Sequence, residues 1–449
     1  MPRETMGRRA FLHTSAAGLA AGAAAPLLGS KALGANEKIV VGFMGCGGRG
    51  TQVATEILAR PDVEIAWLAD ADSARAAAAA AAIEKRAGKR PRTTQDFREI
   101  LDDKAVHALF NTTPDHWHAL PTVLGCQAGK DVYVEKPASH NIWEGRQMVK
   151  AARKYNRIVQ VGLQNRSAPY VRAAVDYLRA GKLGRVHFVR VLNMKTRGAL
   201  PKRPDAEPPK TIDYDLWLGP APKRPFNPSR CHGGWYWLWD YSGGDIVCDG
   251  VHQMDIARWL IGRTVPRYTV ATGGRYFFDD EADTPDTQCV LYDYGDLTMQ
   301  FDLTLWTPYL KKIPQSIRMS DTEFPDWMFC ATRIEVYGSK GLMMLGRHGG
   351  GWQVFDPDGK LIEKNKGKFP AVPHYENFFE CVKSRKRPNG DIEEGHLSTV
   401  LCHLGNISLR VGGRRLEFDA AKDCIVGDDE ANALAKRPGR EPWRIPEDV

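Results

Sequence analysis

Six residues near the start of the chain have the spacing of a phosphate-binding loop. They follow an apolar run at 38–44 and read Gly45-Cys46-Gly47-Gly48-Arg49-Gly50. In such a loop the first glycine permits a tight turn, the second lets backbone amides approach a pyrophosphate, and the third lets a strand and a helix pack closely. A helix that begins there directs its positive end at the phosphates. The pattern therefore predicts a dinucleotide site, with contacts from Gly45, Gly47, Gly48, Arg49 and Gly50.

A carboxylate follows the next apolar run. Residues 63–69 read as a second buried strand, and Asp70 stands at its end. A carboxylate at this place can accept hydrogen bonds from both ribose hydroxyls and would repel a 2′-phosphate, so NAD is favoured over NADP. Helix capping is the other role open to an aspartate here, but Asp72 or Ser73 can cap the alanine-rich helix that follows.

Polar residues also follow the third, fourth and fifth apolar runs. The runs lie at 106–110, 131–134 and 157–162, and helical segments separate them. Alternating strands and helices predict a parallel, doubly wound sheet over 36–162, and ligands bind beyond the carboxyl ends of such strands. The residues after these runs should therefore share a rim with the glycine loop. The further expected cofactor contacts are Thr113, Pro114, His116, His118, Glu135, Lys136 and Gln164.

The remainder of the chain, 163–449, has a different pattern. An amphipathic helix is predicted at 169–180, and strand-like runs follow at 185–194, 287–294, 296–305 and 333–337. This pattern indicates an α+β domain with a large, open, mostly antiparallel sheet. One face of such a sheet needs a cover, which either the first domain or another subunit can supply.

The motifs together resemble the Gfo/Idh/MocA family, which includes glucose–fructose oxidoreductase and inositol dehydrogenase. The resemblance rests on the glycine loop, on Asp70, on the run from Thr113 to His118 and on Glu135-Lys136-Pro137. It implies a Rossmann domain followed by an α+β domain, with Lys136 near the nicotinamide ring and the reacting carbinol. It also implies a cis bond before Pro137 and a homo-oligomer, dimer or tetramer, formed through the open sheet.

A second group of polar residues lies on a predicted helix after Gly243-Gly244. Asp245, Cys248, Asp249 and His252 are spaced to form one polar stripe. The family resemblance implies a histidine at His252 and an Asp or Asn four residues earlier, where this chain has Cys248. Either Asp249 takes over that role or the chemistry is altered. The expected catalytic residues are Lys136, which polarises an oxygen, His252, which accepts a proton, and Asp249. Asp249, favoured over Asp245, either orients His252 or binds an adjacent hydroxyl.

Aromatic residues crowd the segment before this helix. Residues 235–241 read Trp-Tyr-Trp-Leu-Trp-Asp-Tyr. Flat rings beside polar groups suit the C–H faces of a sugar, and they suit a packed core or an interface equally well. Both interpretations stay open from the sequence.

The N-terminus has the order of a twin-arginine export signal at 1–35. Arg8-Arg9 precede an Ala- and Gly-rich apolar run, and small residues allow cleavage after Gly34 or Ala35. A disordered basic N-terminus is the alternative. The signal predicts a periplasmic or otherwise exported protein that meets the twin-arginine machinery. Because that route carries folded proteins, it favours a cofactor that is held tightly and recycled on the protein.

Composition excludes several other classes. The chain has 449 residues, of which 43% are apolar and 26% charged, with a formal net charge of +8. Basic residues are spread among acids, so no nucleic-acid partner is expected. The nine cysteines show no CxxC pair, so neither a metal site nor a disulfide framework is indicated. No segment after the leader reads as a membrane span.

The sequence therefore predicts an exported oxidoreductase. It would transfer hydride between a ring hydroxyl of a sugar or glycoside, or the corresponding ketone, and tightly bound NAD. Two alternatives stay open. One is a glycosidase that oxidises its substrate transiently, eliminates the leaving group and returns the hydride, and the other is a non-catalytic sugar sensor.

Overall fold

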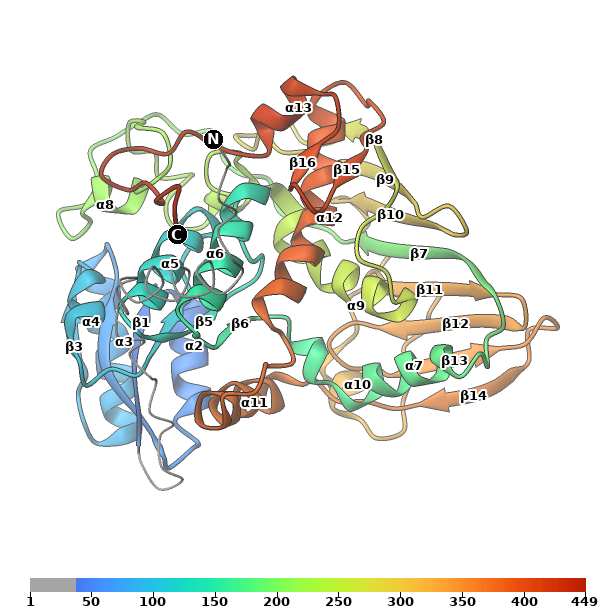
Figure 1. Cartoon of the computed structure of the whole chain (residues 1–449), viewed down its shortest axis with the longest axis horizontal. Coiled ribbons are helices and arrows are strands. Elements are labelled where there is room, and N and C mark those ends of the chain that lie inside the picture. The colour runs from blue at the N-terminus through green and yellow to red at the C-terminus, as the bar shows by residue number, and fades with distance from the viewer. Residues whose placement is uncertain (1–37) are drawn as a thin grey trace, which may run out of the picture. The chain divides into compact units, whose positions relative to one another are not determined.

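The first sheet of the computed structural model, which describes residues 38–449, has six parallel strands (Figure 1). Their order is β3-β2-β1-β4-β5-β6, so the doubly wound prediction is confirmed. The sequence pattern did not reveal β3, because this edge strand is only three residues long and polar. The strands are β1 (Ile39–Met44), β2 (Val63–Ala69), β3 (Arg92–Thr94), β4 (Ala108–Asn111), β5 (Asp131–Val134) and β6 (Val159–Val161).

The helices between these strands begin in two different ways. Asp72 caps α3 by accepting a hydrogen bond from the backbone N–H of Ala74, at 3.0 Å. By contrast α2, which starts at the glycine loop, has no side-chain cap, and its first N–H groups remain available to a ligand. The elements are α2 (Gly48–Ile57), α3 (Ser73–Ala87), α4 (Arg98–Asp102), η1 (Asp115–Trp117), α5 (Ala119–Gln127), α6 (Ile142–Lys154) and η2 (Gln164–Ser167).

The second sheet has eight strands in the order β14-β13-β12-β11-β7-β10-β9-β8. Every neighbouring pair is antiparallel except β7 and β10, which confirms the prediction of a mostly antiparallel sheet. The strands are β7 (Val186–Met194), β8 (Tyr268–Gly274), β9 (Thr287–Asp293), β10 (Thr298–Thr304), β11 (Arg333–Gly338), β12 (Gly341–Gly346), β13 (Trp352–Phe355) and β14 (Leu361–Asn365).

Helices from the part of the chain after residue 163 cover both sheets. Three of them, α7 (Pro169–Arg179), α9 (Val251–Ile261) and α12 (Ile392–Arg410), contact strands of the second sheet. In contrast α11 (Ala371–Ser384) packs on the first sheet, where Phe378 meets Phe110 at 5.4 Å between ring centroids. The shorter elements are α8 (Tyr214–Leu218), η3 (Gly234–Trp237), η4 (Ile246–Gly250), α10 (Gln315–Met319), β15 (Phe418–Asp419), β16 (Cys424–Ile425) and α13 (Asp429–Leu434).

The polar helix after Gly244 differs from the predicted single stripe. Its first part, η4, is a π-helical turn, and regular α-helix begins only with α9. Asp249 pairs with Lys195, at 2.7 Å, whereas Cys248 contacts Asp115 instead, at 2.9 Å. The wider π turn changes the angular spacing of its residues, so the side chains reach two different sets of partners.

The predicted leader, 1–35, lies outside the described residues. Within 38–449 we find no helix that combines the length and the apolar character needed to cross a membrane.

Candidate cofactor and substrate site

A cavity of about 410 Å³ lies at the carboxyl ends of β1, β2, β4 and β5. Most of the predicted cofactor contacts line it, although they come from four separate strand ends. Its volume is within the usual range for ligand sites. The predicted residues that line it are Gly45, Gly47, Gly48, Arg49, Gly50, Asp70, Thr113, Pro114, Glu135 and Lys136.

The glycines of the loop have distinct local surroundings. A Cβ at Gly50 would lie 2.0 Å from the carbonyl oxygen of Gly45, so no other residue fits there. Gly45 itself has a φ of +92°, which side chains rarely adopt. A Cβ at Gly48 would meet nothing within 4 Å, so this side of the loop is open. The open side and the uncapped start of α2 fit the pyrophosphate of NAD.

Asp70 occupies the place predicted for ribose recognition. Its carboxylate lines the cavity and accepts hydrogen bonds from the backbone N–H of Cys46, at 2.7 Å, and of Asp72, at 2.9 Å. Burial raises the pKa of Asp70. Each oxygen still has a free lone pair for a ribose hydroxyl. Asp70 therefore also braces the glycine loop, a function that the sequence did not suggest.

Glu135 braces the same loop from the other side. The Arg49 guanidinium lies 2.7 Å from its carboxylate and also donates to the hydroxyl of Tyr375, at 3.1 Å. Burial would raise the pKa of Glu135, but Arg49 and Lys136 outweigh burial and lower it. Glu135 thus links the loop that carries Lys136 to the glycine loop.

Lys136 follows β5 and reaches toward the second domain. Its Nζ donates to the backbone carbonyl of Cys248, at 2.7 Å, and lies 5.7 Å from the ring centroid of Tyr236. The bond between Lys136 and Pro137 is cis, as expected. Lys136 lines the cofactor cavity and contacts η4, so it stands where the two domains meet.

His252 does not line the cavity, but it lies close enough to Lys136 for the lysine's charge to affect the pKa of His252. It is only 5% exposed, and its Nδ1 has no hydrogen-bond partner among the described residues. Burial first, then Arg347 and Lys136, hold its pKa well below the ordinary value. His252 is therefore neutral at neutral pH and able to accept a proton.

Asp249 is committed to other partners. It pairs with Lys195, at 2.7 Å, and with Arg347, at 2.9 Å. Burial opposes its ionisation, but these two cations hold its pKa well below the ordinary value. In the part of the chain that is described, no hydrogen bond joins Asp249 to His252. Asp249 lies within electrostatic range of His252, but its carboxylate is held by the two cations instead of orienting the imidazole through a hydrogen bond.

Cys248 contacts a carboxylate rather than replacing one. Its Sγ lies 2.9 Å from Asp115 and 2.8 Å from the hydroxyl of Ser242, which also donates to Asp115. Burial, and then Asp115, raise the pKa of this thiol. Asp115 lines the cavity and was missed by the sequence reasoning, although it lies inside the quoted motif.

Three predicted cofactor contacts do not line the cavity. His116 is fully buried, its Nε2 lies 3.0 Å from the carbonyl oxygen of Trp217, and burial lowers its pKa to about 3. The ring nitrogens of His118 lie beside the carbonyl oxygens of Pro137 and Thr113, at 2.7 and 3.0 Å. Gln164 donates to the hydroxyl of Tyr133, at 3.3 Å. All three side chains connect loops around the cavity.

The far side of the cavity is formed by a segment of the second domain, 211–242, which we call the roof. It is joined to the first domain by hydrogen bonds: Ser73 N–H to the Thr211 carbonyl, at 2.9 Å, and Trp117 Nε1 to the Trp217 carbonyl, at 3.0 Å. The roof contributes several lining side chains, and sequence reasoning did not assign them to the cofactor. These are Leu216, Trp217, His232, Trp235 and Tyr236.

The aromatic residues of the roof divide between two functions. Trp235 and Tyr236 line the cavity, whereas Trp237 and Trp239 pack under Arg197 and Arg410, both at 4.8 Å. The aromatic run is therefore part cavity lining and part packing, and stacking against a sugar stays a prediction for Trp235 and Tyr236. His232 also pairs with Asp72 across the cavity edge, at 3.0 Å.

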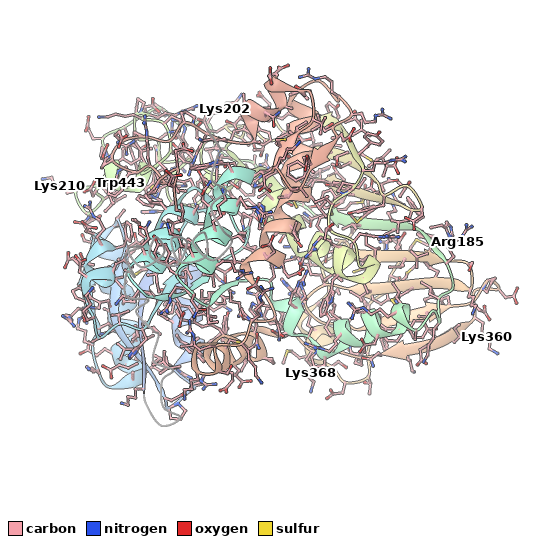
Figure 2. All side chains as sticks on the ribbon, viewed as in Figure 1. Arg185, Lys202, Lys210, Lys360, Lys368 and Trp443 are labelled. Atoms are coloured by element: carbon pink, nitrogen blue, oxygen red, sulfur yellow. The ribbon has the colours of Figure 1, made fainter. Side chains whose placement is uncertain are left out.

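The C-terminal tail holds the roof in place. It runs from α13 past α8 (Figure 1), and Figure 2 labels Trp443 in this region. Arg440 donates to the carbonyl oxygens of Gly219 and Asp215, at 2.9 and 2.8 Å, and Trp443 packs edge-on against Trp117, at 5.2 Å. The tail thus connects the roof to the loop that carries Thr113 and Pro114.

Comparison with known proteins assigns the family. The NAD-binding Rossmann model of the Gfo/Idh/MocA oxidoreductase family matches residues 39–163, and its C-terminal alpha/beta domain matches 196–288 and 339–445. Levoglucosan dehydrogenase of Pseudarthrobacter phenanthrenivorans is 30% identical over 170 residues, which are 38% of this chain and 37% of the relative. The scyllo-inositol 2-dehydrogenase (NAD(+)) of Bacillus subtilis is 24% identical over 66% of this chain and 73% of its own length. The chain thus matches well under two thirds of the levoglucosan dehydrogenase.

Solved structures share the fold. The aldose–aldose oxidoreductase of Caulobacter crescentus, complexed with glycerol, has a TM-score of 0.64 at 17% identity, covering 85% of this chain and all of the other. A levoglucosan dehydrogenase, in complex with NADH and levoglucosan, has a TM-score of 0.62 at 17% identity, covering 87% of this chain and all of the other. Both family models together span more than half of the sequence, and the residues of the cavity fit NAD. The chain belongs to the Gfo/Idh/MocA oxidoreductase family and has its NAD-binding Rossmann domain at the N-terminus.

Proposed function

We propose that this protein is an exported NAD-dependent oxidoreductase that acts on a ring CH–OH group of a sugar or glycoside, or on the corresponding ketone, with a retained cofactor. Family membership supports the oxidoreductase chemistry. The named activities of two relatives, a levoglucosan and a scyllo-inositol dehydrogenase, support a sugar or polyol substrate. The single observation that carries the proposal is the convergence of Lys136 with the glycine loop and Asp70 on one cavity.

Lys136 and His252 have different roles at the substrate oxygen. Bound NAD supplies the acceptor for the hydride. Lys136 carries a positive charge at the junction of the two domains, where it stabilises negative charge on the reacting oxygen. His252 is buried and neutral, so it takes up the hydroxyl proton when the alcohol is oxidised and returns it when the ketone is reduced.

The roof and the tail support retention of the cofactor. Roof residues line the cavity opposite the glycine loop, and hydrogen bonds tie the roof to the first domain. A bound dinucleotide would leave only after these contacts had opened. Retention in turn suits the paired Arg8-Arg9, because the twin-arginine route would carry a folded and loaded protein to the periplasm.

A homo-oligomer, dimer or tetramer, completes the proposal. Helices cover one face of the second sheet, and several large apolar side chains near this sheet remain exposed, including Leu291 at 40% and Met328 at 72%. Contiguous exposed apolar surface is typical of association sites. Sedimentation of the purified protein tests this part, and a monomer at micromolar concentration would contradict it.

The test of the activity is turnover of sugars by the purified holoprotein. We expect glycosides or polyols to change the nicotinamide absorbance and chromatography to reveal a keto-sugar. Cleavage of a glycoside without net reduction of the cofactor would favour the transient-oxidation glycosidase instead. Binding of the sugar without any reaction would favour the non-catalytic sugar sensor. Full activity in Lys136→Ala would overturn the assignment of this residue.

A further inference from the structure

The second-domain side of the site has more positive than negative charge. Lys195 pairs with Asp245, at 2.9 Å, and with Asp249, at 2.7 Å, and Arg347 pairs with Asp249, at 2.9 Å. Two further cations, Lys312 and Arg318, lie within electrostatic range of Asp249. We call Lys195, Lys312, Arg318 and Arg347 the basic cluster. Two carboxylates thus face four cations, and the surplus is positive.

The two added cations have no acid of their own. Within residues 38–449 neither the Lys312 ammonium nor the Arg318 guanidinium forms a hydrogen bond or an ion pair. The Nε of Arg318 and the Nε of Arg347 are buried without a partner. Burial, and then the charge of Arg347, lower the pKa of Arg318. The Lys312 side chain is exposed and Arg318 is half-buried, so both charges are open to an anion that enters from solvent. The buried Nε donors of Arg318 and Arg347, together with the surplus of positive charge, indicate that an anionic ligand is bound here.

The turn between β12 and β13 brings part of the cluster to His252. Arg347 and His348 begin this turn, and His348 has a φ of +58°, which is uncommon outside glycine. Its backbone N–H donates to Asn165, at 3.0 Å, and its ring lies 4.4 Å from the ring of His252. The next three residues, Gly349 to Gly351, also have positive φ. Glycine adopts a positive φ readily, so only His348 carries backbone strain in this turn, and strain at a residue other than glycine is common at functional sites.

The basic cluster adjoins the reacting end of the cofactor cavity. The Nζ of Lys136 and the Nζ of Lys195 both lie over the ring of Tyr236, at 5.7 and 6.0 Å from its centroid. Tyr236 lines the cavity. A sugar whose hydroxyl meets Lys136 would therefore extend toward Lys195 and the rest of the cluster.

We propose that the basic cluster binds an anionic group of the substrate, so that the protein acts on a sugar bearing a carboxylate, sulfate or phosphate rather than on a neutral sugar. This inference rests on the proposed function, because it names the substrate class of the same site. The anionic group would pair with Lys312 and Arg318, while Asp245 and Asp249 keep Lys195 and Arg347 in place. Charge pairing of this kind selects among substrates of similar shape.

Matched substrates test the proposal. The holoprotein is given methyl β-D-glucoside and methyl β-D-glucuronide, which differ only at C6, and D-glucose beside its 6-phosphate and 6-sulfate. Calorimetry measures binding, and nicotinamide absorbance measures turnover. We expect the anionic member of at least one pair to bind about tenfold more tightly or better, with an advantage that shrinks as salt is added. The three anions distinguish carboxylate from phosphate and sulfate.

Variants assign the preference to the cluster. Lys312→Gln and Arg318→Gln should each lower the ratio of anionic to neutral affinity about fivefold or more, and Arg318→Lys should restore part of it. The control is Lys368→Gln, because Lys368 is half exposed and pairs with Asp321 at the surface (Figure 2). It should leave the ratio unchanged.

Two results separate the possible failures. Equal affinity for the members of every pair, or a preference that survives both Lys312→Gln and Arg318→Gln, would overturn the anionic-substrate proposal. If neutral sugars were still oxidised in that case, the proposed function would stand. If no sugar of either charge altered the nicotinamide while the anionic members bound preferentially, the cluster would stand as a binding site and the proposed function would fall.

Discussion

The cofactor half and the substrate half of the site are each stabilised by a different kind of interaction. In the first domain the cofactor side depends on backbone geometry, as at Gly45, Gly50 and the uncapped start of α2. In the second domain the substrate side depends on charged side chains, as in the ion pairs of Asp249 with Lys195 and Arg347. The glycine loop is one continuous run of the sequence, whereas the ion pairs of Asp249 join residues 54 and 98 positions apart. The difference predicts different responses to substitution.

The junction between the halves should be the most sensitive point. Among residues 38–449, Lys136 is the only side chain that both lines the cavity and donates to η4, and Lys136→Ala removes it. We expect kcat to fall by about 10³-fold or more, because charge on the reacting oxygen is no longer stabilised. Stopped-flow reduction of bound cofactor measures this. The fold and the bound nucleotide should persist, and a loss of nucleotide equal to the loss of rate would indicate a cofactor-binding role alone.

The backbone-built half should discriminate between glycines with different surroundings. Gly50→Ala places a Cβ 2.0 Å from the Gly45 carbonyl oxygen, so we expect the loop to distort and NAD affinity to fall by about 100-fold or more. Gly198→Ala is the control, because a Cβ there meets nothing within 4 Å and Gly198 does not line the cavity. Fluorescence titration with NADH compares the two. Equal effects would show that the loop does not have the geometry described here.

A substitution in the substrate half, which ion pairs stabilise, should lower the free energy of unfolding. Asp249→Asn leaves Lys195 and Arg347 without their shared carboxylate, and breaking a buried ion pair in this way costs about 3–5 kcal/mol. Urea unfolding of the holoprotein measures the loss. Asp279→Asn is a suitable control, since Asp279 pairs with Lys202 at the exposed surface. A stability within about 1 kcal/mol of the native protein would contradict the structural role of Asp249.

The pH dependence should come from the second half. His252 must be neutral to accept a proton, and burial, Arg347 and Lys136 lower its pKa below the ordinary value of about 6.5. We therefore expect kcat/KM for alcohol oxidation to show no loss from His252 protonation near neutrality, and to fall only at acid pH, by about tenfold per unit once that pKa is passed. A loss that begins above neutrality and disappears in His252→Asn would mean that the pKa is raised instead.

The tail should have the smallest effect, limited to cofactor release. Arg440→Ala removes hydrogen bonds to Gly219 and Asp215 in the roof, so we expect NADH to dissociate several-fold faster without a change in the fold. Arg444→Ala is the matched control, because the one ion pair of Arg444 within the described range 38–449 is with Glu441 inside the tail. Competition with excess NAD in a stopped-flow instrument follows the release. Identical dissociation rates in the two variants would show that the contacts of Arg440 do not slow NADH release.

The same contrast explains what could be predicted from the sequence. The glycine loop, Asp70 and Glu135-Lys136-Pro137 lie at strand ends, so a parallel sheet places them together without further information. Asp115 was missed because its partners, Ser242 and Cys248, are more than a hundred residues away. Periodicity predicted one polar stripe over 245–252, but the π turn η4 separates Asp249 from Cys248. The cavity-lining role of the roof could not be predicted, because aromatic residues pack in a core as readily as against a ligand.

The claim that joins both halves is that the cofactor is enclosed between them and stays bound. The most direct test is to purify the mature protein without added nucleotide, pass it through gel filtration, denature it and quantify released NAD(H) by chromatography. We expect about one nucleotide per chain, retained through extended dialysis, as for a slow dissociation rate. A protein that emerges free of nucleotide and exchanges added NAD within milliseconds would contradict this claim.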